Sequence, residues 1–144
     1  MTVTDEQVAT LRAQLAGQVD EHRRLLDQLD PVAARTGYAA LVAAAFSLAV
    51  DRRFSGSSDS GIIQFVGDVR SRAPELADRL EPRTAERLIR AVISDEEIDD
   101  ISTEASFRTQ LILLGGLIGD ERLDGEGLDR VVAEARKLAD EWLD

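Results

Sequence analysis

The chain has no cysteine, a single histidine, and aromatic residues at only 4% of its 144 positions. The absence of cysteine excludes disulfide frameworks, thiolate zinc sites and cysteine nucleophiles. The one histidine, His22, leaves no second imidazole for a metal site or a catalytic mechanism that needs two in one chain. We therefore expect neither a thiolate nor a two-histidine chemistry.

Basic charge is also scarce, with 17 basic and 28 acidic residues and a formal net charge of −11. Nucleic-acid binding and docking on anionic membranes both depend on Lys and Arg, so we expect neither partner. Residues 95–144 carry five basic and fifteen acidic side chains and hold nearly all the excess negative charge. This last third is either an interaction surface for a basic partner or a solvated exterior, and its composition does not separate the two.

A long hydrophobic run is missing as well. The longest nearly apolar stretch, Tyr38–Val50, has 13 residues with only Ser47 polar, short of the ~20 that span a bilayer. The start of the chain, MTVTDEQVATLR, has neither the basic nor the apolar region of a signal peptide. With 31% charged and 44% hydrophobic residues, the composition predicts one globular domain over residues 1–144, located in the cytoplasm.

Helical periodicity dominates the sequence. Thr4 and Gln7 have the spacing of a capping box, which predicts a helix start. The apolar stripe that follows steps by three and four residues along the segment 1–29, at Val8, Leu11, Leu15, Val19, His22, Leu26 and Leu29. The pattern predicts one long amphipathic helix with a narrow apolar stripe, suited to pairing with another chain.

Later segments repeat the helical pattern. Asp30-Pro31 predicts the start of a second helix that runs to about Arg53 and is buried because it is apolar on most sides. A loop at 54–61, a helix ending near Arg72 and a helix opening at Glu81-Pro82 follow. A helix at 103–118 has a strand at 111–114 as its alternative, and its Gly115-Gly116 pair indicates either fraying or a close backbone approach. With a last helix after 124–127, the sequence predicts an all-α compact bundle of about six helices.

One set of charged side chains forms a candidate binding site. Arg83, Arg87 and Arg90 share one edge of the predicted helix after Pro82, and arginine can grip phosphate or carboxylate with two hydrogen bonds. The alternative is pairing within the chain, with acids such as Glu86 and Asp95. The apolar stripe of the N-terminal helix is a second candidate, with Leu15 and His22 as partner-binding residues. A neutral histidine tolerates burial and a protonated histidine resists it, so this position would be sensitive to pH.

No catalytic or metal-binding motif is present. The acidic runs at 95–100 and 120–126 lack the ligand spacing of a calcium loop. The Ser- and Gly-rich loop at 55–61 lacks the lysine of a phosphate-binding loop and reads as a connector. We therefore expect no cofactor, no metal and no small-molecule ligand.

The sequence favours a non-enzymatic, accessory or regulatory module that binds another protein, with a homodimer as one form of that partner. A nucleic-acid-associated regulator that uses Arg83, Arg87 and Arg90 is the alternative, and it requires the acidic last third to point away from the nucleic acid.

Overall fold

The computed structural model describes residues 2–144, including every side chain in that range except that of Arg35. Within this range the chain is helical and contains no strand, which confirms the all-α class. The α-helices are α1 (Asp5–Leu15), α2 (Val19–Gln28), α3 (Pro31–Ala33), α4 (Ala39–Phe54), α5 (Asp59–Arg72), α6 (Pro74–Ala77), α7 (Pro82–Ser94), α8 (Thr103–Glu121) and α9 (Gly125–Leu143). One π-helical turn, η1 (Ala34–Tyr38), precedes α4. The residues 111–114 are helical, so the strand alternative is wrong.

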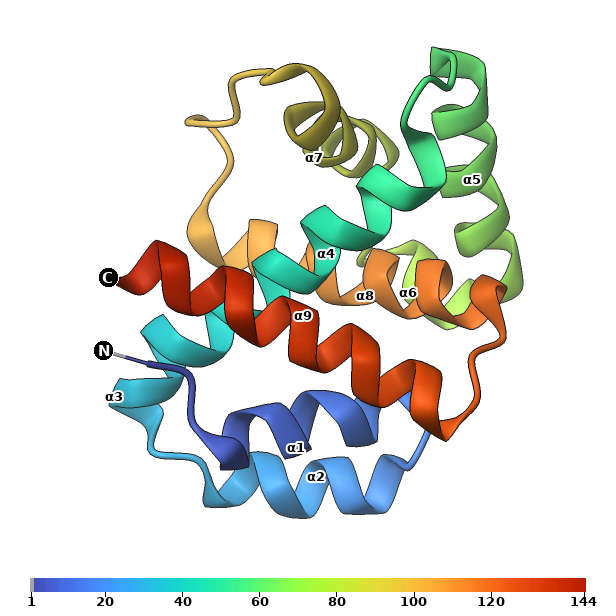
Figure 1. Ribbon diagram of the computed structural model, residues 1–144. Coiled ribbons are helices and arrows are strands. Elements are labelled where there is room, and N and C mark those ends of the chain that lie inside the picture. The colour runs from blue at the N-terminus through green and yellow to red at the C-terminus, as the bar shows by residue number, and fades with distance from the viewer. Residues whose placement is uncertain (1) are drawn as a thin grey trace. The chain divides into compact units, whose positions relative to one another are not determined.

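The predicted single helix over residues 1–29 is wrong. α1 ends at Leu15, and α2 runs back alongside it in the opposite direction (Figure 1). Gly17 has a positive φ of 75°, and the amide of Gly17 donates to the carbonyl of Gln14 while that of Gln18 donates to that of Ala13. This pair of bonds is a Schellman motif, in which a left-handed residue after the helix satisfies its last carbonyls. Glycine adopts that conformation at little cost, so the helix stops here.

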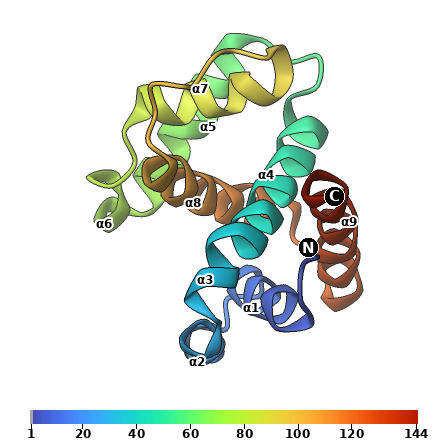
Figure 2. The same cartoon turned by 90° about the vertical axis from the view of Figure 1, so that its left-hand side faces the viewer.

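Contacts along the chain group the residues into two compact units, 1–45 with 118–144 and 46–117. In the first unit, α1 contacts both α2 and α9, and both views show α1 between the other two (Figures 1 and 2). Two ion pairs join α1 to α9: Arg136 donates to Asp5 at 2.7 Å, and Arg12 donates to Asp129 at 2.5 Å. The N-terminal segment is therefore anchored to the last helix by charge as well as by packing.

The π-helical turn lies where α1 meets the start of the second predicted helix. The Gln7 side chain is buried, accepts from the Thr4 amide at 3.1 Å and donates to the Ala33 carbonyl at 3.4 Å. A Cβ built on Gly37 would lie 2.6 Å from Gln7 Oε1, so any larger residue there would displace this amide. The capping box of α1 is thus confirmed, and its glutamine also contacts the next helical segment.

The second unit is held by α5, which contacts α6 and α7. Its apolar side chains Ile62, Phe65, Val66 and Val69 are buried, and the Phe65 ring meets the Phe54 ring edge-on with centroids 5.5 Å apart. α7 begins as the sequence predicts, with Glu81 as N-cap and Pro82 as the first helical residue. Its inner residues Ala85, Leu88 and Ile89 are buried.

The Gly115-Gly116 pair lies inside α8, which continues unbroken to Glu121. A Cβ built on Gly116 would lie 2.9 Å from Val69 Cγ2, nearer than carbon atoms approach without displacement. Gly116 therefore permits a close approach between α8 and α5, as one of the two sequence interpretations proposed.

The second predicted helix is enclosed, as expected. The side chains of Leu41, Val42, Phe46 and Val50 are at most 1% exposed. The helical segment Pro31–Phe54 has 24 residues and is the one segment in the described part of the chain long and apolar enough to cross a bilayer. Buried core helices share this length and composition, and about half of its most apolar window, 47%, is buried inside the protein. The single domain and the single bundle of about six helices stay predictions. α3 begins at the predicted start of the second helix, whereas α6 was not predicted and the predicted first helix is two helices.

Candidate functional site

The arginine edge of α7 is built on a local helix start. The carboxylate of Glu81 accepts hydrogen bonds from the Arg83 amide at 3.2 Å and from the Thr84 amide at 2.7 Å. The bond from the Thr84 amide is the main cause that lowers the pKa of Glu81, and the Thr84 hydroxyl adds to it. With this end capped and Leu88 packed inward, the amphipathic helix holds the arginines on its outer side.

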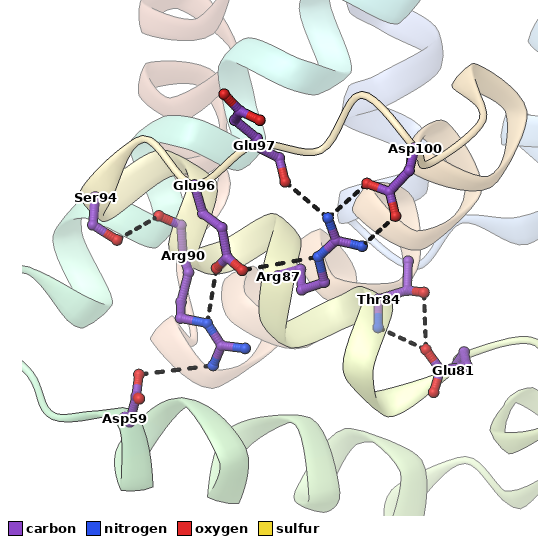
Figure 3. Close-up of polar contacts among 9 residues, drawn as sticks. All are labelled: Asp59, Glu81, Thr84, Arg87, Arg90, Ser94, Glu96, Glu97 and Asp100. Carbon is purple, nitrogen blue, oxygen red and sulfur yellow. Dashed lines mark hydrogen bonds and ion pairs between the residues drawn. The ribbon is translucent and has the colours of Figure 1, made fainter.

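Arg87 is the most fully bonded arginine of this edge. Its guanidinium donates to both carboxylate oxygens of Asp100, at 2.8 and 2.7 Å, and to the carbonyl of Glu97 at 2.8 Å (Figure 3). The hydrogen bonds from Arg87 to the Asp100 carboxylate are the largest cause that lowers the pKa of Asp100 to about 2. Asp100 lies 13 residues along the chain, so the contact holds the loop between α7 and α8 on the outer face of α7.

Arg90 connects three segments of the second unit. Its Nε donates to Glu96 at 3.0 Å, and its Nη1 lies 3.7 Å from a carboxylate oxygen of Asp59, the first residue of α5 (Figure 3). The hydroxyl of Ser94 donates to the Arg90 carbonyl at 3.0 Å. The loop after α7 and the start of α5 are thereby both connected to α7.

Arg83, Arg87 and Arg90 do lie together, around an open cavity of about 460 Å³ that Glu96 and Asp100 also line. The alternative, pairing of the arginines with acids of the same chain, is found for Arg87 and Arg90. The partners are Glu96, Asp100 and Asp59, and not the predicted Glu86 and Asp95. Acids of the adjacent loop neutralise much of the charge of this edge, which leaves little net positive field for a phosphate. Spacing along α7 predicts the shared edge, whereas the partners come from a loop whose path the sequence does not predict.

The predicted N-terminal stripe is largely used within the chain. Leu11 is fully buried and Leu15 is half-buried. His22 Nδ1 lies 3.0 Å from the carbonyl of Thr10. Because a carbonyl only accepts, the ring donates its Nδ1 proton there and joins α2 to α1. His22 therefore belongs to the contact of α2 with α1, and Leu15 is only partly exposed at the end of α1.

What remains exposed lies on α2. None of its ten residues is buried, and Val19 and Leu26 are 65% and 44% exposed. These two residues are seven apart, so they lie on the same side of the helix. They are on the predicted stripe, whose predicted partner-binding residues are Leu15 and His22 instead. Gly17 is the sequence signal that could have identified Val19 and Leu26, because the turn at Gly17 folds the second half of the stripe back on the first.

Charges flank this apolar pair. Glu21 and Arg24 form an ion pair at 2.5 Å, and its hydrogen bond lowers the pKa of Glu21. Asp20, Arg23 and Asp27 are exposed, and among residues 2–144 the structure gives their side chains no ion pair. We call Val19, Leu26, Asp20, Arg23 and Asp27 the α2 face.

The remaining candidates have structural explanations. α5 begins at Asp59, inside the predicted Ser- and Gly-rich loop 55–61, so the last three residues of that predicted loop are helical. A second cavity of about 310 Å³ near this loop is lined in part by Arg53 and Phe65, with the Arg53 guanidinium 5.1 Å from the centre of the Phe65 ring. In the part of the chain that the structure describes, no three acidic or histidine side chains come together as a metal site would require.

Comparison with protein-family models, with curated proteins and with solved structures gives no match for this chain. The site geometry is therefore the basis for a functional proposal.

Proposed function

We propose that this protein is a non-enzymatic helical module that binds another protein through the α2 face. The observation that carries the proposal is the exposure of Val19 and Leu26 on a helix that buries no residue of its own. Exposed apolar side chains that share a face and are rimmed by charge are typical of protein interaction sites. As further parts of the same proposal, we retain the single domain, the bundle of about six helices and the cytoplasmic location.

The arginine edge supports a different role. Arg87 and Arg90 connect α7 with a neighbouring loop and with α5, and their carboxylate partners would have to be displaced before either could bind a phosphate. No contact favours the nucleic-acid alternative over the protein-binding one. We therefore propose that these arginines stabilise the second unit.

The proposal is tested by affinity capture from the native host with the tagged full chain and its Val19→Asp/Leu26→Asp variant. Two charges in the α2 face should abolish capture of a bound protein, because each carboxylate would be desolvated in the interface. Ile63→Asp is the matched control, since Ile63 is 52% exposed on α5 and its substitution should leave capture intact. Circular dichroism checks that all variants fold. Equal capture by the α2 variant and the control would refute the proposal.

A further inference from the structure

The α2 helix is the outer helix of the first unit. α1 contacts both α2 and α9, and α1 lies between them in both views (Figures 1 and 2). The side of α2 that carries His22 is joined to α1. Val19 and Leu26 lie beside this contact and are exposed, about 10 Å apart along the helix axis, at 1.5 Å per residue.

The charges of the α2 face all lie on one flank of the apolar pair. At 100° per residue, Arg23 is the charged residue nearest to Val19 and Leu26, and Asp20 and Asp27 lie just beyond it. Arg24 is already paired with Glu21. The flank therefore offers one cation and two anions without ion-pair partners among the described residues.

We propose that the α2 face binds a second copy of this chain, with the two α2 helices antiparallel about a two-fold axis. The inference rests on the proposed function and names its partner. With the axis between His22 and Arg23, Val19 of each copy lies opposite Leu26 of the other. An isologous contact of this kind buries both apolar pairs at once.

Charge complementarity selects the antiparallel orientation. In that arrangement the charged flank of one helix faces the same flank of the other, and Arg23 lies about 3 Å along the axis from the level of Asp20 of the second copy. The two Arg23 side chains lie about 1.5 Å apart along the axis, and each has Asp20 of the other copy beside it, so two arginines are balanced by two aspartates and the ion pair forms twice. In a parallel pair the charged flank would face the α1 side of the other helix, and these pairs would not form.

The size of the contact predicts how tight the dimer is. A ten-residue helix is about 15 Å long, so two such faces bury less than the roughly 1,200 Å² of a standard stable interface. We expect a weak dimer in rapid exchange with the monomer, weakened further by salt because its ion pairs are at the rim.

Analytical ultracentrifugation of the full chain from about 10 µM to about 1 mM, the range where weak complexes dissociate, tests the dimer. Asp20→Arg alone and Arg23→Asp alone each convert two attractive pairs into two repulsive ones. Each should raise the dimer dissociation constant by about tenfold or more. The double variant Asp20→Arg/Arg23→Asp, and a one-to-one mixture of the two single variants, should both restore dimerisation, because opposite charges again face each other.

The swap also controls for folding. The double variant carries both substitutions of the single variants, so restored association cannot come from a damaged helix, and circular dichroism checks each chain. A wild-type chain that stays monomeric at every concentration would overturn the inference, as would single variants that are not rescued by mixing. If the monomeric chain still captured another protein through Val19 and Leu26, the proposed function would stand and only the self-association would fail.

Discussion

α1 and α2 are consecutive helices of 11 and 10 residues that continue one apolar stripe, yet they differ in burial. α1 buries Gln7, Thr10, Leu11 and Ala13, whereas α2 buries nothing. The difference follows from position in the first unit: α1 lies between α2 and α9, and among the described helices α2 makes its main contact with α1 (Figures 1 and 2). A stripe thus predicts which side of a helix is apolar, and the number of neighbours decides how much of it is covered.

The largest test of this comparison is truncation of one leucine in each helix. Leu11→Ala removes a side chain that is fully buried and should lower the free energy of unfolding by about 2–5 kcal/mol. Leu26→Ala removes one that is 44% exposed and should cost less than about 1 kcal/mol. Urea denaturation at low protein concentration, where a dimer does not contribute, measures both. Equal losses would contradict the assignment of α1 to the core and α2 to the surface.

The next test addresses the turn that separates the helices. Gly17 has a positive φ, and a Cβ built on it has no heavy atom within 4 Å. Gly17→Ala should therefore cause no steric clash and should lower the free energy of unfolding by about 1–2 kcal/mol through backbone strain alone.

Gly119→Ala is the matched control for this substitution. Gly119 is equally open but lies inside α8, so alanine there should add about 0.5–1 kcal/mol to the free energy of unfolding. Thermal unfolding shows whether each of the two substitutions lowers or raises the stability of the protein. A neutral or stabilising Gly17→Ala would indicate that the segment forms the continuous helix predicted from its pattern.

The helix starts give a smaller contrast. Thr4 caps α1 with its hydroxyl, whereas Gln18 precedes α2 without a side-chain cap bond. Thr4→Ala should lower the free energy of unfolding by about 1 kcal/mol, and Gln18→Asp should raise it by about 0.5 kcal/mol. Chemical denaturation measures the two changes. A gain at Gln18 smaller than the error, with the loss at Thr4 intact, would show that α2 does not depend on its cap.

The smallest effect on stability is expected from the ion pairs of two exposed carboxylates. Glu21 pairs with Arg24 within α2, whereas Asp100 pairs with Arg87 of α7 from the loop that follows that helix. Arg87 is the main cause that lowers the pKa of Asp100 from its ordinary 3.8 to about 2. Because the folded pKa of Asp100 is lower, its contribution to stability is complete above pH 3.8 and is lost as the pH falls toward 2. Carboxyl NMR signals report the titration. In Arg87→Gln the midpoint of Asp100 should return toward 3.8, and an unchanged midpoint would exclude Arg87 as the cause.

Much of the fold could be predicted wherever local chemistry decides it. Asp30-Pro31 and Glu81-Pro82 start helices as predicted, because an N-cap side chain and a proline need only their own backbone. The helix ending at Arg72 is also as predicted. The break at Gly17 was missed although its signal was present, since a glycine after the last apolar residue of a helix is typical of a C-terminus.

The candidate sites were less predictable. The shared edge of Arg83, Arg87 and Arg90 follows from helical spacing, but their acidic partners depend on how the loop after α7 folds back. The same holds for His22, whose partner is the carbonyl of Thr10 twelve residues earlier. Such contacts join positions far apart in the chain, and spacing within one helix contains no information on them.

By itself, the sequence determined the helical class, the start of most helices and the apolar side of each, because these depend on side chains within a few residues of one another. Only the tertiary structure decided that the first stripe folds on itself, that Arg87 holds Asp100, and that Val19 and Leu26 are left exposed. The physical reason is that the burial and ion pairing of a side chain depend on which other segment packs against it. Chain reversals such as the one at Gly17 determine which segments pack against each other.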